Sequence, residues 1–143
     1  MTELLKLKAK DADDIQVISA VLQDSIAPVV DMDYRAEAKN FIMVVQRLCR
    51  ETGTDTTKER ICCALNIRGV ENVQTHGFNP ASTDQMLDLL ALLPEGNDLH
   101  LVFASDARIR LQLKDWSLII EDFGEPWPAQ CRPCHDGEDG VRA

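Results

Sequence analysis

The chain has 143 residues, of which 45% are hydrophobic and 27% charged, a balance typical of one globular domain. Lysine and arginine total 15 against 24 for aspartate and glutamate, so the formal net charge is -9 at pH 7. A chain this acidic is not a general nucleic-acid binder, because neutralising phosphates requires a concentrated positive surface. No apolar run resembles an export signal or approaches the ~20 residues that span a bilayer. We therefore expect a cytoplasmic protein that binds neither nucleic acid nor membranes.

The first elements are a short strand and one helix. Residues 5–8 alternate leucine with lysine, which predicts a half-buried strand. Asp11 then provides an N-cap, and apolar residues follow at helical spacing: Ile15, Ile18, Leu22 and Ile26. Because the residue before a proline is disfavoured in a helix, Pro28 predicts the end of this amphipathic helix after about four turns.

The remainder of the chain has the period of β-strands. A polar, threonine-rich stretch over residues 50–59 predicts a long hairpin tip. The apolar run over residues 86–93 is short enough to be either strand or helix, and we interpret it as a strand because a hairpin-like loop follows. The predicted strands are residues 29–35, 41–49, 61–67, 70–76, 86–93, 99–103, 109–113 and 116–123.

These elements predict an α+β fold that is mainly antiparallel β. About eight strands joined by short loops must be antiparallel neighbours, and their apolar faces must close over one core. We expect a small barrel or two-sheet sandwich with one N-terminal helix, similar to a pleckstrin-homology-like roll. Residues 1–127 form this single domain, whereas residues 128–143 are an acidic, Pro/Gly-rich tail that we expect to be partly disordered.

Several segments resemble one known family. They are Asp11-Ala-Asp-Asp-Ile15 at the start of the helix, Leu99-His-Leu-Val-Phe103, Ile109-Arg-Leu-Gln-Leu113 and the closing Pro126-Trp127. With them the chain, from Leu4 to about Asp136, resembles an uncharacterised alphaproteobacterial family known only as a domain of unknown function. The resemblance supports the domain boundaries and implies no activity, cofactor or catalytic residue.

The tail contains one cofactor-like motif, Cys131-Arg-Pro-Cys134-His135. The C-x-x-C-H pattern is typical of covalent haem attachment, and the same three side chains could ligate zinc with His76, His100 or a core cysteine as the fourth ligand. Haem attachment normally requires export, and a structural zinc site usually has two such pairs. We therefore expect all five cysteines to be reduced and no cofactor to be bound, with a metal site at Cys131, Cys134 and His135 as the alternative.

Catalytic patterns are weak. The chain has three histidines, no G-x-S-x-G nucleophile motif and no glycine-rich phosphate loop. Asp31 and Asp33 share one strand face and could act as paired carboxylates, but Arg35 continues that face and favours a solvated charge ladder. We leave enzymatic activity unassigned and favour its absence.

A basic stripe is the clearest candidate for binding. Arg108, Arg110 and Lys114 alternate along one predicted strand, and Arg47 and Arg68 lie on neighbouring ones. Our leading hypothesis is a non-enzymatic module that binds a protein or peptide through this stripe or an exposed strand edge. The alternative is a small-molecule or metal-binding protein, or an enzyme, with a pocket near the helix and His76. A homodimer in which the edge strands of two chains pair with each other is a further alternative.

Overall fold

The computed structural model describes residues 4–49 and 59–128, which form eight antiparallel strands and one α-helix. In chain order the elements are β1 (Lys6–Ala9), α1 (Ala12–Leu22), β2 (Ser25–Pro28), the 3-10 turn η1 (Val29–Asp31), β3 (Met32–Arg35), the 3-10 turn η2 (Ala36–Ala38), β4 (Asn40–Cys49), β5 (Glu59–His76), β6 (Met86–Glu95), β7 (Asp98–Phe103) and β8 (Arg108–Pro128). The predicted fold class is confirmed, including the assignment of residues 86–93 to a strand.

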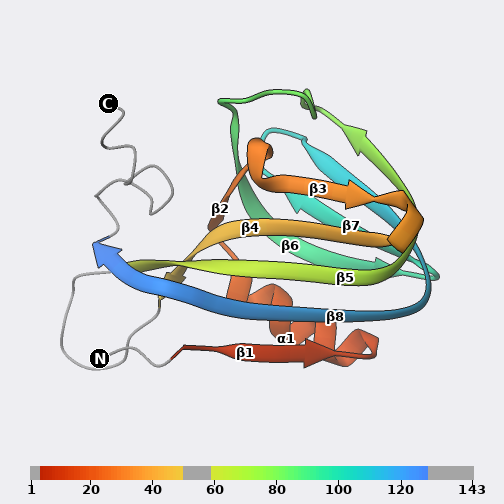
Figure 1. The fold of residues 1–143 in the computed structure, drawn as a ribbon, viewed down its shortest axis with the longest axis horizontal. Coiled ribbons are helices and arrows are strands. Elements are labelled where there is room, and N and C mark those ends of the chain that lie inside the picture. Colours follow the sequence, from red (N-terminus) through yellow and green to blue (C-terminus); the bar gives the residue numbers. More distant parts are fainter. Residues whose placement is uncertain (1–3, 50–58, 129–143) are drawn as a thin grey trace.

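Six of the strands form a closed ring (Figure 1). The order of hydrogen-bonded neighbours is β8-β5-β4-β2-β6-β7, and β7 pairs again with β8. Two of the three four-residue strands attach outside this path, β1 to β8 and β3 to β4. Each of these two therefore has a strand partner on one edge only within the described part of the chain. For β3, the unpaired edge is the one that faces away from β4.

The two longest strands, β5 and β8, pair along most of their length and bend together. Sequence analysis predicted each of them as two strands, interrupted at Gly69 and after Lys114. The structure corrects this, because positive φ angles at Gly69 (85°) and Asp115 (49°) bend the strands while pairing resumes beyond a register shift. β5 and β8 therefore remain paired with each other on both sides of their common bend.

Helix α1 lies beneath the ring, next to β1 and β6 (Figure 1). The Asp11 carboxylate caps its first turn by accepting a hydrogen bond from the backbone N–H of Asp14 at 2.9 Å. Ile15, Ile18 and Leu22 are buried in the core. The predicted end at Pro28 is wrong: the helix ends at Leu22, and the next four-residue strand, β2, was missed.

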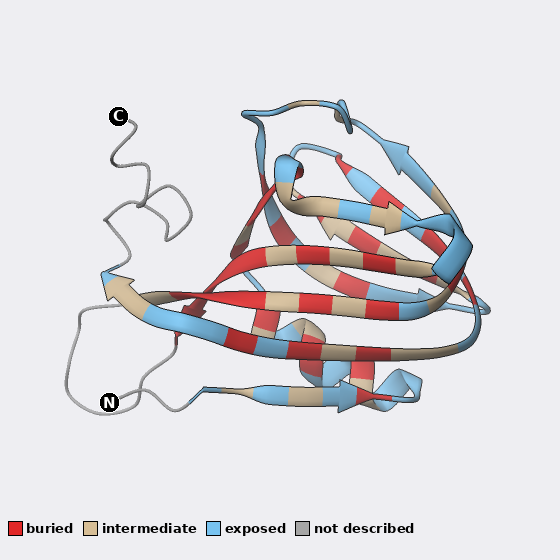
Figure 2. Cartoon of the chain, in the orientation of Figure 1, coloured by how far each residue is buried: buried red, intermediate tan, exposed pale blue. Residues whose placement is uncertain are grey.

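The core follows the predicted alternation (Figure 2). On β8, Ile109, Leu111 and Leu113 are buried while the residues between them are exposed. The same two-residue rhythm buries alternate residues of β4, β6 and β7, so one apolar interior fills the ring. The prediction that residues 29–35 form one strand holds only from Met32, because Val29–Asp31 form a 3-10 turn that leaves Val30 exposed.

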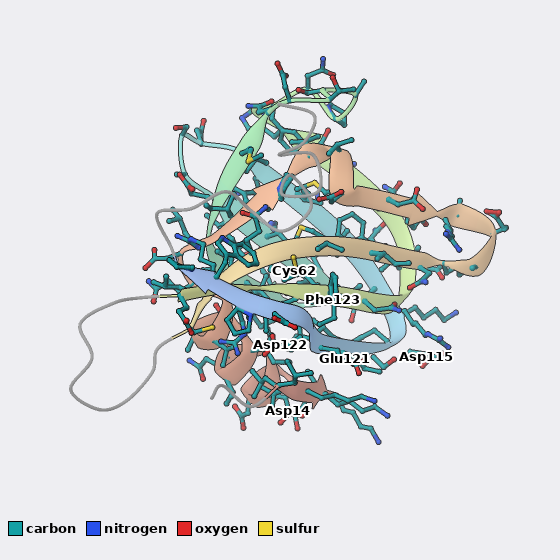
Figure 3. The ribbon with its side chains drawn as sticks, turned by 60° about the vertical axis from the view of Figure 1, so that its left-hand side comes forward. Asp14, Cys62, Asp115, Glu121, Asp122 and Phe123 are labelled. Atoms are coloured by element: carbon teal, nitrogen blue, oxygen red, sulfur yellow. The ribbon has the colours of Figure 1, made fainter. Side chains whose placement is uncertain are left out.

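One charged pair is buried inside the ring. Arg47 of β4 donates two hydrogen bonds to Asp122 of β8, Nε to Oδ1 at 2.8 Å and Nη2 to Oδ2 at 2.7 Å. Asp122, labelled on β8 in Figure 3, also accepts a hydrogen bond from the backbone N–H of Leu5 at 2.9 Å. The hydrogen bond to Asp122 raises the pKa of Arg47. Arg47 is therefore not part of an exposed basic stripe, which corrects the sequence-based expectation.

The thiol of Cys63 is buried beside this pair. Burial, and next the negative charge of Asp122, raise the pKa of Cys63 to about 12. At pH 8 only about one such thiol in ten thousand is a thiolate, the form that reacts with alkylating agents. We expect peptide mapping after iodoacetamide treatment at pH 8 to find Cys63 unmodified in the folded protein and modified in urea. Rapid labelling of folded protein would contradict the buried environment.

Candidate functional site

An apolar pocket opens on the side of the ring that β3 borders. Its volume is about 120 Å³, and no residue of α1 lines it. The lining comes from three parts of the chain that lie far apart in the sequence, and most of it is apolar: Val29, Met32, Asp33, Tyr34, Phe41, Val73, Thr75, Phe78, Pro80 and Ile109. Pockets of this kind, mainly apolar with a few polar groups at the edge, are the usual places where proteins bind ligands.

Strand alternation directs these side chains into the pocket. Val73 and Thr75 lie on β5 opposite Leu111 and Ile109 of β8, so all four share the inward phase of their strands. Thr75 remains exposed because it lies where the ring opens. Phe41, at the beginning of β4, is buried, and Arg47 lies six residues further along the same strand. At the usual rise this places the pocket about 20 Å from the buried ion pair.

The segment after β5 forms a wall of the pocket. Gly77 turns the chain with a φ of 84°, and a Cβ atom there would lie 2.4 Å from the carbonyl oxygen of Asp106. Phe78 then packs edge-on against Phe103, with ring centroids 6.4 Å apart. Side chains hold the following turn, since Asn79 accepts a hydrogen bond from the N–H of Ala81 at 3.0 Å. This wall is therefore formed before any ligand binds.

Tyr34, which lines the pocket, joins β3 to β5 through its hydroxyl. Its hydroxyl donates a hydrogen bond of 2.8 Å to the carbonyl oxygen of Val70. Replacing Tyr34 with phenylalanine removes this bond and keeps the ring, so we expect a loss of about 1 kcal/mol in the free energy of unfolding. Urea denaturation monitored by circular dichroism measures this change. An unchanged free energy would mean that water replaces the hydroxyl without cost.

The edge of β3 that faces away from β4 borders the pocket. β3 pairs with β4 from Met32↔Met43 to Arg35↔Asn40, and no second strand pairs with it in the described ranges. Asp33 and Arg35 form an ion pair at 3.2 Å, and both side chains are about 60% exposed. Such an exposed pair contributes little to stability. The site therefore combines free backbone groups, an apolar cavity and one loosely held carboxylate.

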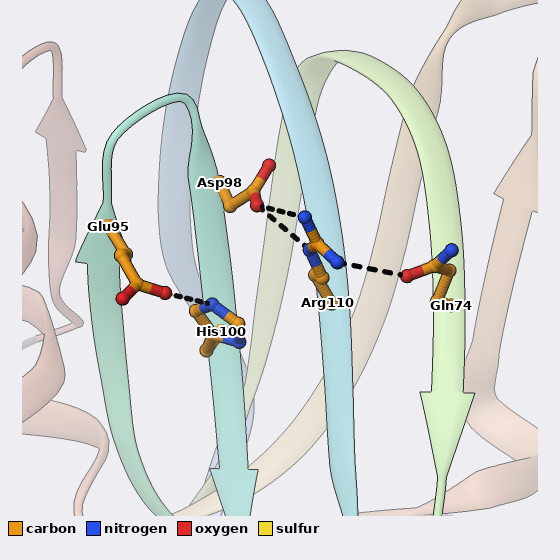
Figure 4. A network of polar contacts seen from close by, with 5 residues as sticks. All are labelled: Gln74, Glu95, Asp98, His100 and Arg110. Carbon is orange, nitrogen blue, oxygen red and sulfur yellow. Dashed lines mark hydrogen bonds and ion pairs between the residues drawn. The ribbon is translucent and has the colours of Figure 1, made fainter.

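The predicted basic residues are only partly brought together. Arg108, Arg110 and Lys114 are exposed along one face of β8, as predicted. Arg68 is also exposed, but it pairs with Ser117 beyond the bend in β8. Figure 4 shows that Arg110 donates to Asp98, Nε at 2.8 Å, and to Gln74 at 3.4 Å. The Asp98 carboxylate offsets the charge of Arg110, so this face carries both signs of charge.

His76 and His100 each lie close to a carboxylate. His100 Nε2 lies 3.0 Å from Glu95 Oε1, on the same outer face (Figure 4). His76 is exposed, and its Nε2 lies 3.7 Å from Asp106 Oδ2. His76 directly follows Thr75 of the pocket, but α1 contributes nothing to the lining. Of the two features expected to flank a pocket, only His76 is close to this one.

The cysteines give a mixed result. Cys49 and Cys63 are buried and form no disulfide, whereas Cys62 is disulfide-bonded, which contradicts the expectation that all five are reduced. Cys131, Cys134 and His135 lie outside the described residues. Within residues 4–49 and 59–128, no group of three or more His, Cys, Asp or Glu side chains is placed to hold a metal ion. None of the helices in those ranges has the length and apolar character to cross a membrane.

A comparison with known families identifies the group to which the chain is related. Residues 5–135 match the family described as "Protein of unknown function (DUF2948)". The chain belongs to this family. The match confirms the resemblance to a domain of unknown function but not its alphaproteobacterial origin, and the whole pocket lies within the matched residues. Neither the curated proteins nor the solved structures give a significant match.

Sequence reasoning missed most of this site. It considered Asp33 only as one of two paired carboxylates, and it left residues 77–85 as a connection between two predicted strands. The apolar Phe78 in this connection was an available signal, because the large apolar ring of a phenylalanine usually packs against other side chains. Asp31 belongs to η1 and not to the strand that carries Asp33, so the predicted carboxylate pair on one strand face is wrong.

Proposed function

We propose that this member of the family is a non-enzymatic module that binds a protein or peptide. The observation that carries the proposal is the unpaired edge of β3 beside the apolar pocket. An exposed strand edge presents a row of backbone N–H and C=O groups, which is a ready template for another extended chain. In an antiparallel fold of this kind, an edge with which no second strand pairs, as for β3 within residues 4–49 and 59–128, favours strand addition.

The basic face is the weaker of the two surfaces considered. Asp98 and Gln74 already engage Arg110, and a partner would have to replace these contacts. Arg68 pairs with Ser117, away from the basic residues of β8 that precede the bend. Among the residues that the structure describes, no second strand occupies the β3 edge, so this edge is our preferred binding surface.

The polar groups of the pocket support a binding role over a catalytic one. Tyr34 donates its hydroxyl hydrogen to Val70, and Asp33 pairs with Arg35. These contacts direct both groups toward their own neighbours and not toward Thr75. General acid–base catalysis requires the reacting groups to lie within hydrogen-bonding reach of one another or of the substrate. We therefore favour recognition without chemistry.

Affinity purification followed by native mass spectrometry tests the binding role. We expect tagged protein, expressed in its source cell, to carry a recurrent protein partner at defined stoichiometry. The matched sample is the Thr75→Trp variant, in which a large side chain is placed at the opening of the pocket. Loss of the partner with this variant supports the β3 edge. Absence of any stoichiometric partner with the unmodified protein would contradict the binding-module proposal.

A second candidate is a small-molecule or metal-binding protein, which the 120 Å³ pocket favours. The same native spectra reveal a bound small molecule as a fixed mass increment, and metal analysis with an absorption spectrum covers zinc and haem. A stoichiometric increment without a protein partner would place this candidate first.

We also propose that the protein acts in the bacterial cytoplasm, away from nucleic acid and membranes. The net charge of -9 supports the exclusion of nucleic acid, and the thiol of Cys63, which is not in a disulfide, supports a reducing compartment. The disulfide at Cys62 argues in the other direction, because disulfides are rare in the reducing cytosol. Cell fractionation is expected to recover the protein with the cytosolic markers. Recovery from an exported fraction with Cys62 oxidised would contradict the proposal.

A further inference from the structure

We infer that the pocket and the β3 edge together bind one kind of partner, an extended peptide with a large aliphatic side chain flanked by lysine or arginine. The peptide adds a strand to β3, inserts the aliphatic side chain into the pocket and faces Asp33 with its basic residue. This inference rests on the proposed function and names the chemistry of the partner.

The extended conformation of the peptide follows from the unpaired edge of β3. Four consecutive residue pairs hold β3 flat against β4, so its other edge is already in the geometry of a ladder. In an added strand, successive side chains alternate between the two faces of the sheet. One of them therefore points to the inner side of the ring, where Met32 and Tyr34 line the pocket.

The aliphatic side chain follows from the size and the walls of the pocket. Phe41, Val73, Phe78 and Ile109 surround a volume of about 120 Å³. A cavity of about 150 Å³ with comparable walls takes up benzene, so this one suits leucine, isoleucine or methionine. Burying such a side chain is the main favourable contribution of an anchor of this type.

The lysine or arginine beside the aliphatic residue of the peptide follows from the negative charge at the pocket. Asp33 is the one charged residue among those that line the pocket, and the whole chain carries a net charge of -9. Its partner Arg35 is largely exposed, so a basic residue of the peptide can replace it at little cost. An acidic peptide would be repelled during its approach to this body.

The test uses a displayed library of random nonapeptides, selected against the full chain. We expect the enriched sequences to share an aliphatic residue with lysine or arginine within two positions. Synthetic copies are then titrated by fluorescence anisotropy against the unmodified protein and three variants. Thr75→Trp blocks the pocket and should weaken binding at least about tenfold. Asp33→Asn should weaken it about threefold and reduce its dependence on salt.

Gln74→Trp is the matched control. Gln74 is the neighbour of Thr75, is equally exposed, and points to the opposite face of β5. The same tryptophan there should leave the affinity within about twofold, a change below 0.5 kcal/mol by the usual conversion. Circular dichroism checks that each variant folds. If Thr75→Trp does not fold, Asp33→Asn, on an exposed side chain, still tests the inference.

Three outcomes would overturn the inference. The first is peptide binding that neither Thr75→Trp nor Asp33→Asn weakens. The second is enrichment of peptides that lack the aliphatic and basic pair, or of none at all, while a native protein partner is still recovered. In both of these cases the binding-module proposal survives and only the assigned site or chemistry fails. The third is a dimer in analytical ultracentrifugation that Thr75→Trp dissociates, because the occupant is then a second copy of the chain.

Discussion

Replacing Asp122 with alanine is expected to lower the free energy of unfolding by about 4 kcal/mol, the largest effect of any single substitution considered. The reason is that Arg47 would keep its charge in a buried site without its partner. The backbone N–H of Leu5 would lose its acceptor as well. A domain of this size has about 5–15 kcal/mol of stability, so the variant would be close to unfolding. Urea denaturation measures the change.

Glu121→Ala is the matched control for this prediction. Glu121 precedes Asp122 on β8 and is exposed (Figure 3), so its removal should change the stability by less than about 0.5 kcal/mol. A double variant, Arg47→Met with Asp122→Leu, should recover most of the loss, because apolar residues often replace a buried ion pair without cost. If Asp122→Ala costs less than the control, the pair is not buried as described.

Replacing Gly69 with alanine is expected to lower the free energy of unfolding by about 3 kcal/mol, because strain and a backbone clash act together. Gly69 has a φ of 85°, which an L residue rarely adopts. A Cβ atom there would lie 2.5 Å from the carbonyl oxygen of Lys114 and 2.8 Å from the Cα of Trp116, both parts of the backbone of β8. To relieve this clash, β5 would have to move away from β8 at their common bend. The backbone N–H of Gly69 also donates a hydrogen bond to the carbonyl oxygen of Lys39 at this bend.

Gly96→Ala separates the two causes. Gly96 also has a positive φ, 62°, but a Cβ atom there would meet nothing within 4 Å. We expect this variant to lose only the strain contribution, about 1 kcal/mol. Both variants are compared by thermal and urea denaturation. Equal losses at Gly69 and Gly96 would show that the close approach of β8 contributes nothing.

The inward residues of the strands could be predicted because burial on one face requires a period of two. Ile109, Leu111 and Leu113 show this plainly, and the structure buries all three. The end of the helix could not be read in the same way. Ile26 lies four residues after Leu22, which fits a helix, but the chain turns at Asp24 with a φ of 70° and Ile26 joins β2. One apolar residue cannot distinguish the two periods.

The breaks predicted in β5 and β8 failed for a related reason. Glycine commonly ends a strand, but it also permits the bulge that lets a strand bend and continue. Which of the two happens at Gly69 depends on Lys114 and Trp116, which are distant in the sequence. The ion pair had a visible signal, since Arg47 follows Val45 and Asp122 follows Ile120 at the inward spacing. A charge at such a position predicts a buried partner.

The pocket was beyond prediction because its lining is assembled only in three dimensions. Met32, Phe41, Val73, Phe78 and Ile109 each have an ordinary local pattern, and no spacing relates one to the next. Their convergence depends on the closed order of the strands and on the unpaired edge of β3. Local patterns determine which face of a strand is apolar, but they do not determine which edge stays without a neighbour.

The pairing of β1 with β8 has a consequence for how the protein is made. In the described part of the chain β1 pairs with β8 alone, and the hydrogen bond from the N–H of Leu5 to Asp122 joins residues 117 positions apart. On the ribosome the fold therefore cannot close until β8 has emerged. During that interval the apolar faces of the earlier strands have no cover, which is the state that chaperones recognise. Chains that terminate before β8 should aggregate or be degraded, not persist as smaller folded units.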